Sequence, residues 1–242
     1  MKRLRIGLVV LVMLVGIVTG STVAAAAGAT TCSGGTIPAG TYSTLAIAGN
    51  CSIPTGSVLV LGNLTILPGA SLDVSSQEAT LVVYGNVTVG SGATFLLGCS
   101  THPEEGPACH NVGDRINGSL NANGASMVDI HITTIGGGVS LKGGAGFFSD
   151  LEDVTVNGNV SINGYQGVWL GFIRNQVNGS VSYTNNQLTD EDANEIVTNV
   201  IGGNLACSGN SPAPQFGDAI DVPGFMPNVV HGAVSGQCVG LT

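Results

Sequence analysis

Short phrases of alternating apolar and polar residues recur along the chain, beginning with VLGNLTI at 60–66 and VYGNVTV at 83–89. Each phrase centres on an apolar residue that follows a glycine by two positions and a valine or isoleucine by four. The central residues are Leu64, Val87, Leu120, Val139, Val160, Val181 and Leu205. Because alternate side chains of a strand point to opposite faces, each phrase predicts a short strand with one buried face.

The spacing of the phrases predicts how these strands are arranged. Successive central residues are 23, 33, 19, 21, 21 and 24 positions apart, and weaker copies centred on Leu45 and Val234 stand at the two ends. Degraded terminal copies are typical of repeats that cap a stack. We therefore predict an all-β, single-stranded parallel β-helix of about eight to nine coils, with like residues stacked about 4.8 Å apart.

One segment departs from the repeat. In LTDEDANEIVTNVI, at 188–201, Thr189 precedes Asp190, Glu191 and Asp192. A threonine before an acidic first turn is typical of a helix N-terminus. We therefore expect a short helical insertion at this point of the β scaffold.

The N-terminal residues are predicted to be a secretory signal that occupies 1–27. Lys2, Arg3 and Arg5 precede an apolar run at 6–18, and alanines at 25–27 suit cleavage. An apolar run of 13 residues is shorter than the ~20 that a membrane span needs. We therefore expect a secreted or cell-surface protein with one β-helix domain at 28–242 and no membrane span after cleavage.

The six cysteines support this location, because an even number in an exported chain indicates disulfides. Six cysteines allow 15 pairings, and we expect neighbours to pair. Cys99 and Cys109 bracket the loop that lengthens the 33-residue interval, and Cys207 and Cys238 each follow a phrase centre. The predicted bonds, which also close caps at both ends of the domain, are Cys32–Cys51, Cys99–Cys109 and Cys207–Cys238.

The charge restricts the choice of partner. Without the signal, three basic residues remain against 15 acidic ones, a net charge of −12. Such a surface repels nucleic acid and anionic membranes. It also leaves few groups to hold an anionic polysaccharide, so we expect no nucleic-acid partner.

A group of charged residues offers one candidate for catalysis. Asp153 and Arg174 each lie seven residues before a phrase centre, so we expect them to stack, with Asp150 close and Asp129 and His131 in an adjoining coil. A lyase would use such carboxylates to bind Ca²⁺ and a basic residue as base, and a hydrolase would use two carboxylates. A surface ion pair explains the same spacing. We expect no cofactor apart from Ca²⁺ in the enzyme alternative.

The outward positions of the phrases offer a second candidate, a ligand-binding face. They are mostly small and polar, and regular rows of this kind could meet a glycan or ice. A solvated surface with turn asparagines is the alternative. The candidate ligand-face residues are Asn63, Thr65, Asn86, Thr88, Asn159 and Ser161.

The loop CSTHPEEGPACH, at 99–110, offers a third candidate. His102, Glu104 and His110 could ligate a divalent ion. Their spacing matches no standard zinc signature, so we favour an acidic loop closed by a disulfide and assign no metal site.

The phrase set resembles the pectin-lyase-like right-handed β-helix superfold over nearly all of residues 40–240. The tail GGNLACSGNSPAP with VSGQC is similar to the C-terminal ends of small exported bacterial proteins without an assigned function. The Gly-x-Val-x-Val rhythm also resembles bactofilin-type polymerising β-helices, from which the signal and the cysteines depart. The resemblance implies a right-handed β-helix and export, and it carries no catalytic residue to this chain.

These observations together favour an exported, non-catalytic β-solenoid with a structural, cell-surface or adhesive role. The alternatives are a polysaccharide lyase or hydrolase and a glycan- or ice-binding protein that uses the polar rows. Cell-wall or extracellular polysaccharide is the partner that we expect. Self-association by end-to-end stacking of the coils is a further expectation.

Overall fold

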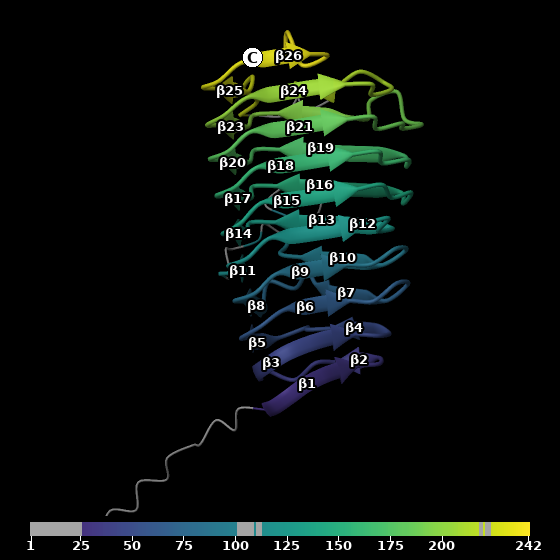
Figure 1. The fold of residues 1–242 in the computed structure, drawn as a ribbon, viewed down its shortest axis with the longest axis vertical. Coiled ribbons are helices and arrows are strands. Elements are labelled where there is room, and N and C mark those ends of the chain that lie inside the picture. Colours follow the sequence, from purple (N-terminus) through teal and green to yellow (C-terminus); the bar gives the residue numbers. More distant parts are fainter. Residues whose placement is uncertain (1–25, 101–108, 110–112, 218–219, 221–223) are drawn as a thin grey trace, which may run out of the picture.

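The computed structural model describes residues 26–100, 109, 113–217, 220 and 224–242. The protein is an all-β solenoid of about eight turns whose parallel strands stack along one long axis (Figure 1). This confirms the fold class that the phrases predict. Most of the predicted signal lies outside the described residues, and the first strand begins at Ala26.

Each regular coil contributes three short strands, one to each of three rows. The first row contains β5 Gly56–Val60, β8 Ala79–Val83, β11 Arg115–Ile116, β14 Thr134–Ile135, β17 Thr155–Val156, β20 Gln176–Val177, β23 Val200–Ile201 and β25 Val229–Val230. The second row contains β6 Leu64–Ile66, β9 Val87–Val89, β12 Leu120–Asn123, β15 Val139–Lys142, β18 Val160–Asn163, β21 Val181–Thr184, β24 Leu205–Ser208 and β26 Val234–Gly236. The longer strands β1 Ala26–Cys32 and β3 Gly40–Ile47 join these two rows into one 18-stranded sheet.

The third row is a separate sheet of eight strands, which we call sheet B. Its members are β2 Gly35–Thr36, β4 Asn50–Ser52, β7 Ser71–Val74, β10 Thr94–Leu97, β13 Met127–His131, β16 Phe148–Glu152, β19 Trp169–Ile173 and β22 Glu195–Val197. In each of these strands, alternate side chains point inward to the core or outward. The outer face of sheet B carries the candidate site.

The phrase centres stack in register, as the repeat predicts. Leu64 pairs with Val87, Val87 with Leu120, and the column continues to Leu205 and Val234. The valines and isoleucines four positions earlier form a second buried column, from Val60 to Ile201. Both columns fill the interior, so each coil buries its apolar residues against the equivalent residues of its neighbours.

The phrase glycines also form a column, and close packing explains why they lack side chains. The backbone N–H of Gly85 donates to the carbonyl of Gly62 (2.9 Å). A Cβ on Gly85 would lie 2.5 Å from that carbonyl oxygen and 2.3 Å from Oδ1 of Asn63. Successive coils therefore approach too closely at this bend for any side chain.

A column of buried asparagines, Asn175, Asn199 and Asn228, runs through the C-terminal coils. The backbone N–H of Asn175 donates to Oδ1 of Asn199 (2.8 Å), while Nδ2 of Asn199 donates to the carbonyl of Phe172 (2.7 Å). The other two members repeat this arrangement. Each amide thus satisfies backbone groups at a turn where the strand ladder is interrupted.

The disulfides join Cys32 to Cys51, Cys99 to Cys109 and Cys207 to Cys238, with Cα–Cα distances of 6.4, 5.7 and 5.2 Å. These are the predicted pairs. The first and third each link adjacent coils near one end of the solenoid, and the second closes the loop after β10.

The predicted helical insertion is wrong. The described residues contain no α-helix. It follows that no helix among them is long and apolar enough to cross a membrane. Residues 189–194 instead make a tight turn in which the Asp192 N–H donates to Oδ1 of Asp190 (2.9 Å). The chain then enters β22, which pairs with β19. Continuing sheet B therefore outweighs the local preference for a capped helix.

Candidate functional site

A cleft with a volume of about 700 Å³ lies over the outer face of sheet B, across β13, β16 and β19. Side chains from these strands form its floor, and segments near Ser75, Cys99 and Asp190 border it. The lining includes Asp129, His131, Phe148, Asp150 and Trp169.

Strand alternation places the polar groups of the cleft on one face. In β13, Val128 and Ile130 are buried in the core, so Asp129 and His131 point outward. The register then stacks Asp129 on Asp150 of the next coil. The same register stacks His131 on Glu152.

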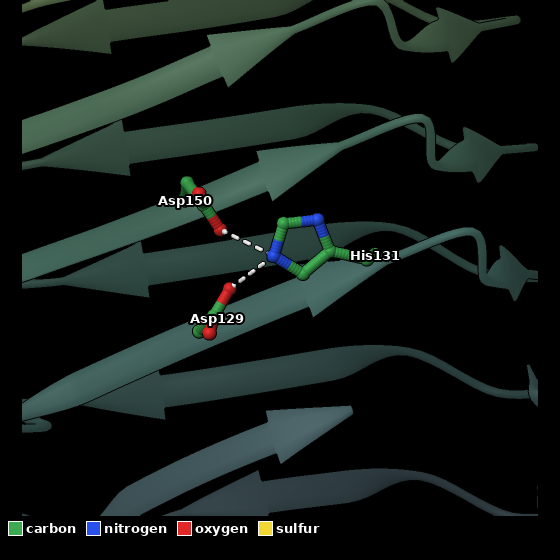
Figure 2. A group of neighbouring side chains, drawn as sticks. All are labelled: Asp129, His131 and Asp150. Carbon is green, nitrogen blue, oxygen red and sulfur yellow. Dashed lines mark ion pairs between the residues drawn. The ribbon is translucent and has the colours of Figure 1, made fainter. Parts of the chain in front are cut away.

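Figure 2 shows the imidazole of His131 facing the carboxylates of Asp129 and Asp150. Its Nε2 lies 2.6 Å from Oδ1 of Asp129 and 3.8 Å from Oδ1 of Asp150. Its Nδ1 lies 3.2 Å from Oε2 of Glu152. One imidazole therefore faces three carboxylates, and His131, Asp150 and Glu152 are each at most 6% exposed.

Arg174 supports this cluster from its edge. Its Nη2 pairs with Oε1 of Glu152, and its Nε and Nη2 lie 3.0 and 2.9 Å from the carboxylate of Asp153. Asp153 and Arg174 occupy equivalent turn positions with φ of 55° and 53°. This left-handed turn after β16 and β19 directs both side chains along the outer face, where Arg174 neutralises much of the charge on Glu152.

The close contacts change the pKa values of the cluster. Burial alone would lower the pKa of His131, but the carboxylates of Asp129, Glu152 and Asp150 raise it to about 11. Burial and the charge of Asp129 raise the pKa of Asp150 well above its usual range. Burial opposes ionisation of Asp129 as well, yet the contact with His131 lowers its pKa. The cleft floor thus combines a carboxyl group that ionises more easily, Asp129, with one that resists ionisation, Asp150.

Aromatic side chains flank the carboxylates. Phe148 and Trp169 are stacked neighbours on the outer face of β16 and β19. The indole of Trp169 lies across Gly171, since a Cβ there would be 2.3 Å from its Cη2 and 3.2 Å from Cβ of Asp150. Gly171 therefore provides the space that lets a flat aromatic surface reach the edge of the carboxylate pair.

Of the residues predicted for catalysis, Asp150 lies in this cleft. Asp153 and Arg174 stack as expected, but their charged groups are occupied with each other and with Glu152 outside the cleft lining. The predicted loop ligands His102, Glu104 and His110 lie outside the described residues.

The predicted ligand-face rows stack in register along β6, β9, β12, β15 and β18. Thr65 pairs with Thr88, and both side chains point outward. The asparagines have a structural task, however. Oδ1 of Asn63 accepts the N–H of Asn86 (2.9 Å), and Oδ1 of Asn159 accepts the N–H of Ser180 (2.8 Å). Their amide oxygens link successive coils, although Asn63, Asn86 and Asn159 remain exposed to solvent.

The cluster contains two residues that sequence reasoning placed nearby but did not assign, Asp129 and His131. A signal for them exists in the sequence. Asp129-Ile130-His131 and Asp150-Leu151-Glu152 repeat an acidic residue, an apolar residue and a polar residue at an interval of 21 positions. That interval equals one coil, so the two motifs must lie side by side on the same face.

No family model, curated protein or solved structure matches the chain.

Proposed function

We propose that this protein is an exported β-solenoid that binds a polysaccharide in the cleft over sheet B. The observation that carries the proposal is the position of Trp169, whose six-membered ring lies over Gly171 beside Asp150 and which is the register partner of Phe148 on the neighbouring strand. Flat apolar surface with a few convergent polar groups is typical of ligand sites. Sugar rings offer apolar faces for such a surface and hydroxyls for the carboxylates.

The charge of the cleft favours one class of polysaccharide. Asp129, Asp150 and Asp190 line it, and among the described residues the only basic side chain that does so is His131, which is paired with carboxylates. A polyuronate would bring further negative charge to this surface. We therefore propose a neutral or amino-sugar polysaccharide as ligand.

Export is part of this proposal, together with a relation to the pectin-lyase-like right-handed β-helices. The three disulfides agree with an extracellular location. Binding without turnover would correspond to an adhesive or cell-surface role, in which the rigid stack of coils presents the cleft.

The experiment measures binding of the mature protein to insoluble neutral, amino-sugar and uronate polysaccharides by pull-down and isothermal titration calorimetry. Trp169→Ala should weaken binding at least about fivefold, because loss of a stacking aromatic contact costs ~1 kcal/mol or more. Tyr84→Ala is the matched control, since Tyr84 is 52% exposed on the other sheet. Equal binding by both variants, or binding to the uronate alone, would overturn the proposal.

Hydrolysis of the bound polysaccharide is a second candidate, favoured by the adjacent carboxylates of Asp129 and Asp150. Together with His131 they offer ligand atoms within 4.8 Å of one another. This is shorter than the roughly 6.5–9.5 Å between the carboxyl groups of inverting glycosidases, so an inverting mechanism is disfavoured. Release of reducing ends in the same tubes, abolished by Asp150→Asn, would support hydrolysis over binding alone.

A further inference from the structure

The floor of the cleft contains a buried carboxyl oxygen that makes no hydrogen bond to the described residues. Asp150 is 5% exposed, and its Oδ1 has no hydrogen-bond partner among the described residues, since the nearest cationic atom is Nε2 of His131 at 3.8 Å. Oδ1 of Asp129 is also buried without a hydrogen bond of good geometry, although it lies 2.6 Å from the same nitrogen. Buried carboxylates require compensation, and these two point at one position.

We propose that Asp129, His131 and Asp150 form a binding site for a divalent transition-metal ion, with Zn²⁺ as the ion that fits their donor set best. The three ligand atoms lie within 4.8 Å of one another. Figure 2 shows them converging from two adjacent coils. This site goes beyond the proposed polysaccharide binding and does not depend on it.

The distances suit a small ion after only minor movement. Zn²⁺ binds nitrogen and oxygen at about 2.0–2.2 Å, so tetrahedral ligand atoms lie about 3.4 Å apart. The observed separations from Nε2 of His131, 2.6 and 3.8 Å, lie on either side of this value. Small rotations of the two aspartate side chains would therefore open the shorter contact and close the longer one.

The surroundings of His131 match those of a metal ligand. A ligating histidine usually directs its second ring nitrogen at a carboxylate, which fixes the ring and increases its basicity. Here Nδ1 lies 3.2 Å from Oε2 of Glu152, although without the geometry of a hydrogen bond, and Glu152 is in turn held by Arg174. Glu152 would therefore act as a positioning residue for His131.

The donor set also selects the kind of ion. Ca²⁺ takes six to eight oxygen ligands and Mg²⁺ prefers oxygen and water, whereas one imidazole with two carboxylates suits Zn²⁺ and similar ions. Three protein ligands beside a cleft leave a fourth position for water or a hydroxyl of a ligand, which is typical of catalytic zinc sites.

The test uses the untagged mature chain with its disulfides formed, treated with EDTA and dialysed free of metal. Isothermal titration calorimetry with ZnCl₂, in the absence of polysaccharide, should give one ion per chain. Asp129→Asn and Asp150→Asn should each weaken binding by about 100-fold or more, and Glu152→Gln by about 10–100-fold. The visible spectrum of the Co²⁺ form of Glu152→Gln should still indicate histidine ligation, which a misfolded chain would not.

Two controls separate this site from other acidic or histidine groups. Asp73 is exposed and belongs to the same outward column two coils before Asp129, so Asp73→Asn removes the same charge and should leave the affinity unchanged. A double His102→Ala, His110→Ala variant should also bind normally. Circular dichroism and thermal unfolding verify that each variant folds.

Three results would overturn the proposal. The first is no bound Zn²⁺, in which case a protonated His131 alone compensates the carboxylates. The second is affinity unchanged by Asp129→Asn and Asp150→Asn. The third is binding lost only in the loop variant. Since polysaccharide is absent from these measurements, they fail or succeed independently of glycan binding.

Discussion

Replacing Asp114 by asparagine is expected to stabilise the solenoid at neutral pH. Asp114 is 3% exposed and occupies the position equivalent to Asn175 in an earlier coil, two residues before a buried column residue. Its Oδ1 accepts the N–H of Leu81 (2.7 Å), just as Oδ1 of Asn175 accepts the N–H of Val154 (2.9 Å). Its Oδ2, however, is buried without a hydrogen-bond partner in the described part of the chain.

The magnitude follows from the pKa of this carboxyl group. Burial, opposed only by the hydrogen bond from Leu81, raises the pKa of Asp114 from 3.8 to about 6. Since one pKa unit corresponds to 1.36 kcal/mol, ionised Asp114 lowers the free energy of unfolding by about 3 kcal/mol. A raised pKa in the folded state means that stability is full below pH 3.8 and falls as the pH rises through 6.

Asparagine removes this charge and can supply a donor that aspartate lacks. In the asparagine column, Nδ2 of Asn175 donates to the carbonyl of Leu151, three residues before Val154 (2.7 Å). Before Leu81 the chain is extended in β8 and lacks the left-handed residue that brings Leu151 close to Val154, so the expected gain comes from removal of the charge. Asp114→Asn should therefore gain about 3 kcal/mol at pH 8.

Equilibrium unfolding in guanidinium chloride at pH 4 and pH 8, with the disulfides intact, measures the effect. Asp114→Asn should be more stable than the wild type at pH 8 and much closer to it at pH 4. The reverse substitution, Asn175→Asp, is the control and should destabilise mainly at pH 8. A gain of equal size at both pH values, or a loss at pH 8, would refute the reasoning.

Four further substitutions test the packing. Gly85→Ala should destabilise by about 3 kcal/mol, because its Cβ would meet the carbonyl of Gly62 at 2.5 Å. Gly69→Ala is the comparison, because Gly69 has a φ of 73° but no atom within 4 Å of an added Cβ. Its free energy of unfolding should fall by only about 1–2 kcal/mol. Equal losses of stability in the two variants would contradict the close approach of the coils at Gly85. Asn199→Ala leaves the backbone N–H of Asn175 without its acceptor. The free energy of unfolding, measured in urea, should therefore fall by about 1–3 kcal/mol. An unchanged value would show that water replaces the amide. Phe172→Ala at a fully buried position should lose about 3–5 kcal/mol, and a loss under 1 kcal/mol would contradict its place in the core.

The sequence alone predicted the architecture because a solenoid repeats one local rule. Each phrase buries its own apolar residues against the same phrase one coil away, as Leu64 and Val87 do. No long-range pairing needs to be guessed, since neighbours along the chain are neighbours in space. For the same reason, the disulfide between Cys32 and Cys51 was predictable from adjacent coils.

The prediction from local sequence preference was wrong where that preference conflicted with the stacking of the coils. Thr189 and the acids after it favour a helix start, yet Glu195–Val197 must extend sheet B beside β19. Backbone pairing along a whole strand outweighs one capping interaction, and that comparison requires the neighbouring coil.

The candidate site depended on tertiary structure in a different way. The interval of 21 residues implies that Asp129 stacks on Asp150, and the register confirms it. The sequence does not show that these carboxylates are buried, that His131 turns its ring toward both, or that Trp169 lies across Gly171. Periodicity determines which residues are neighbours, whereas burial and side-chain direction depend on the loops and aromatic rings that pack over the face, and these do not repeat.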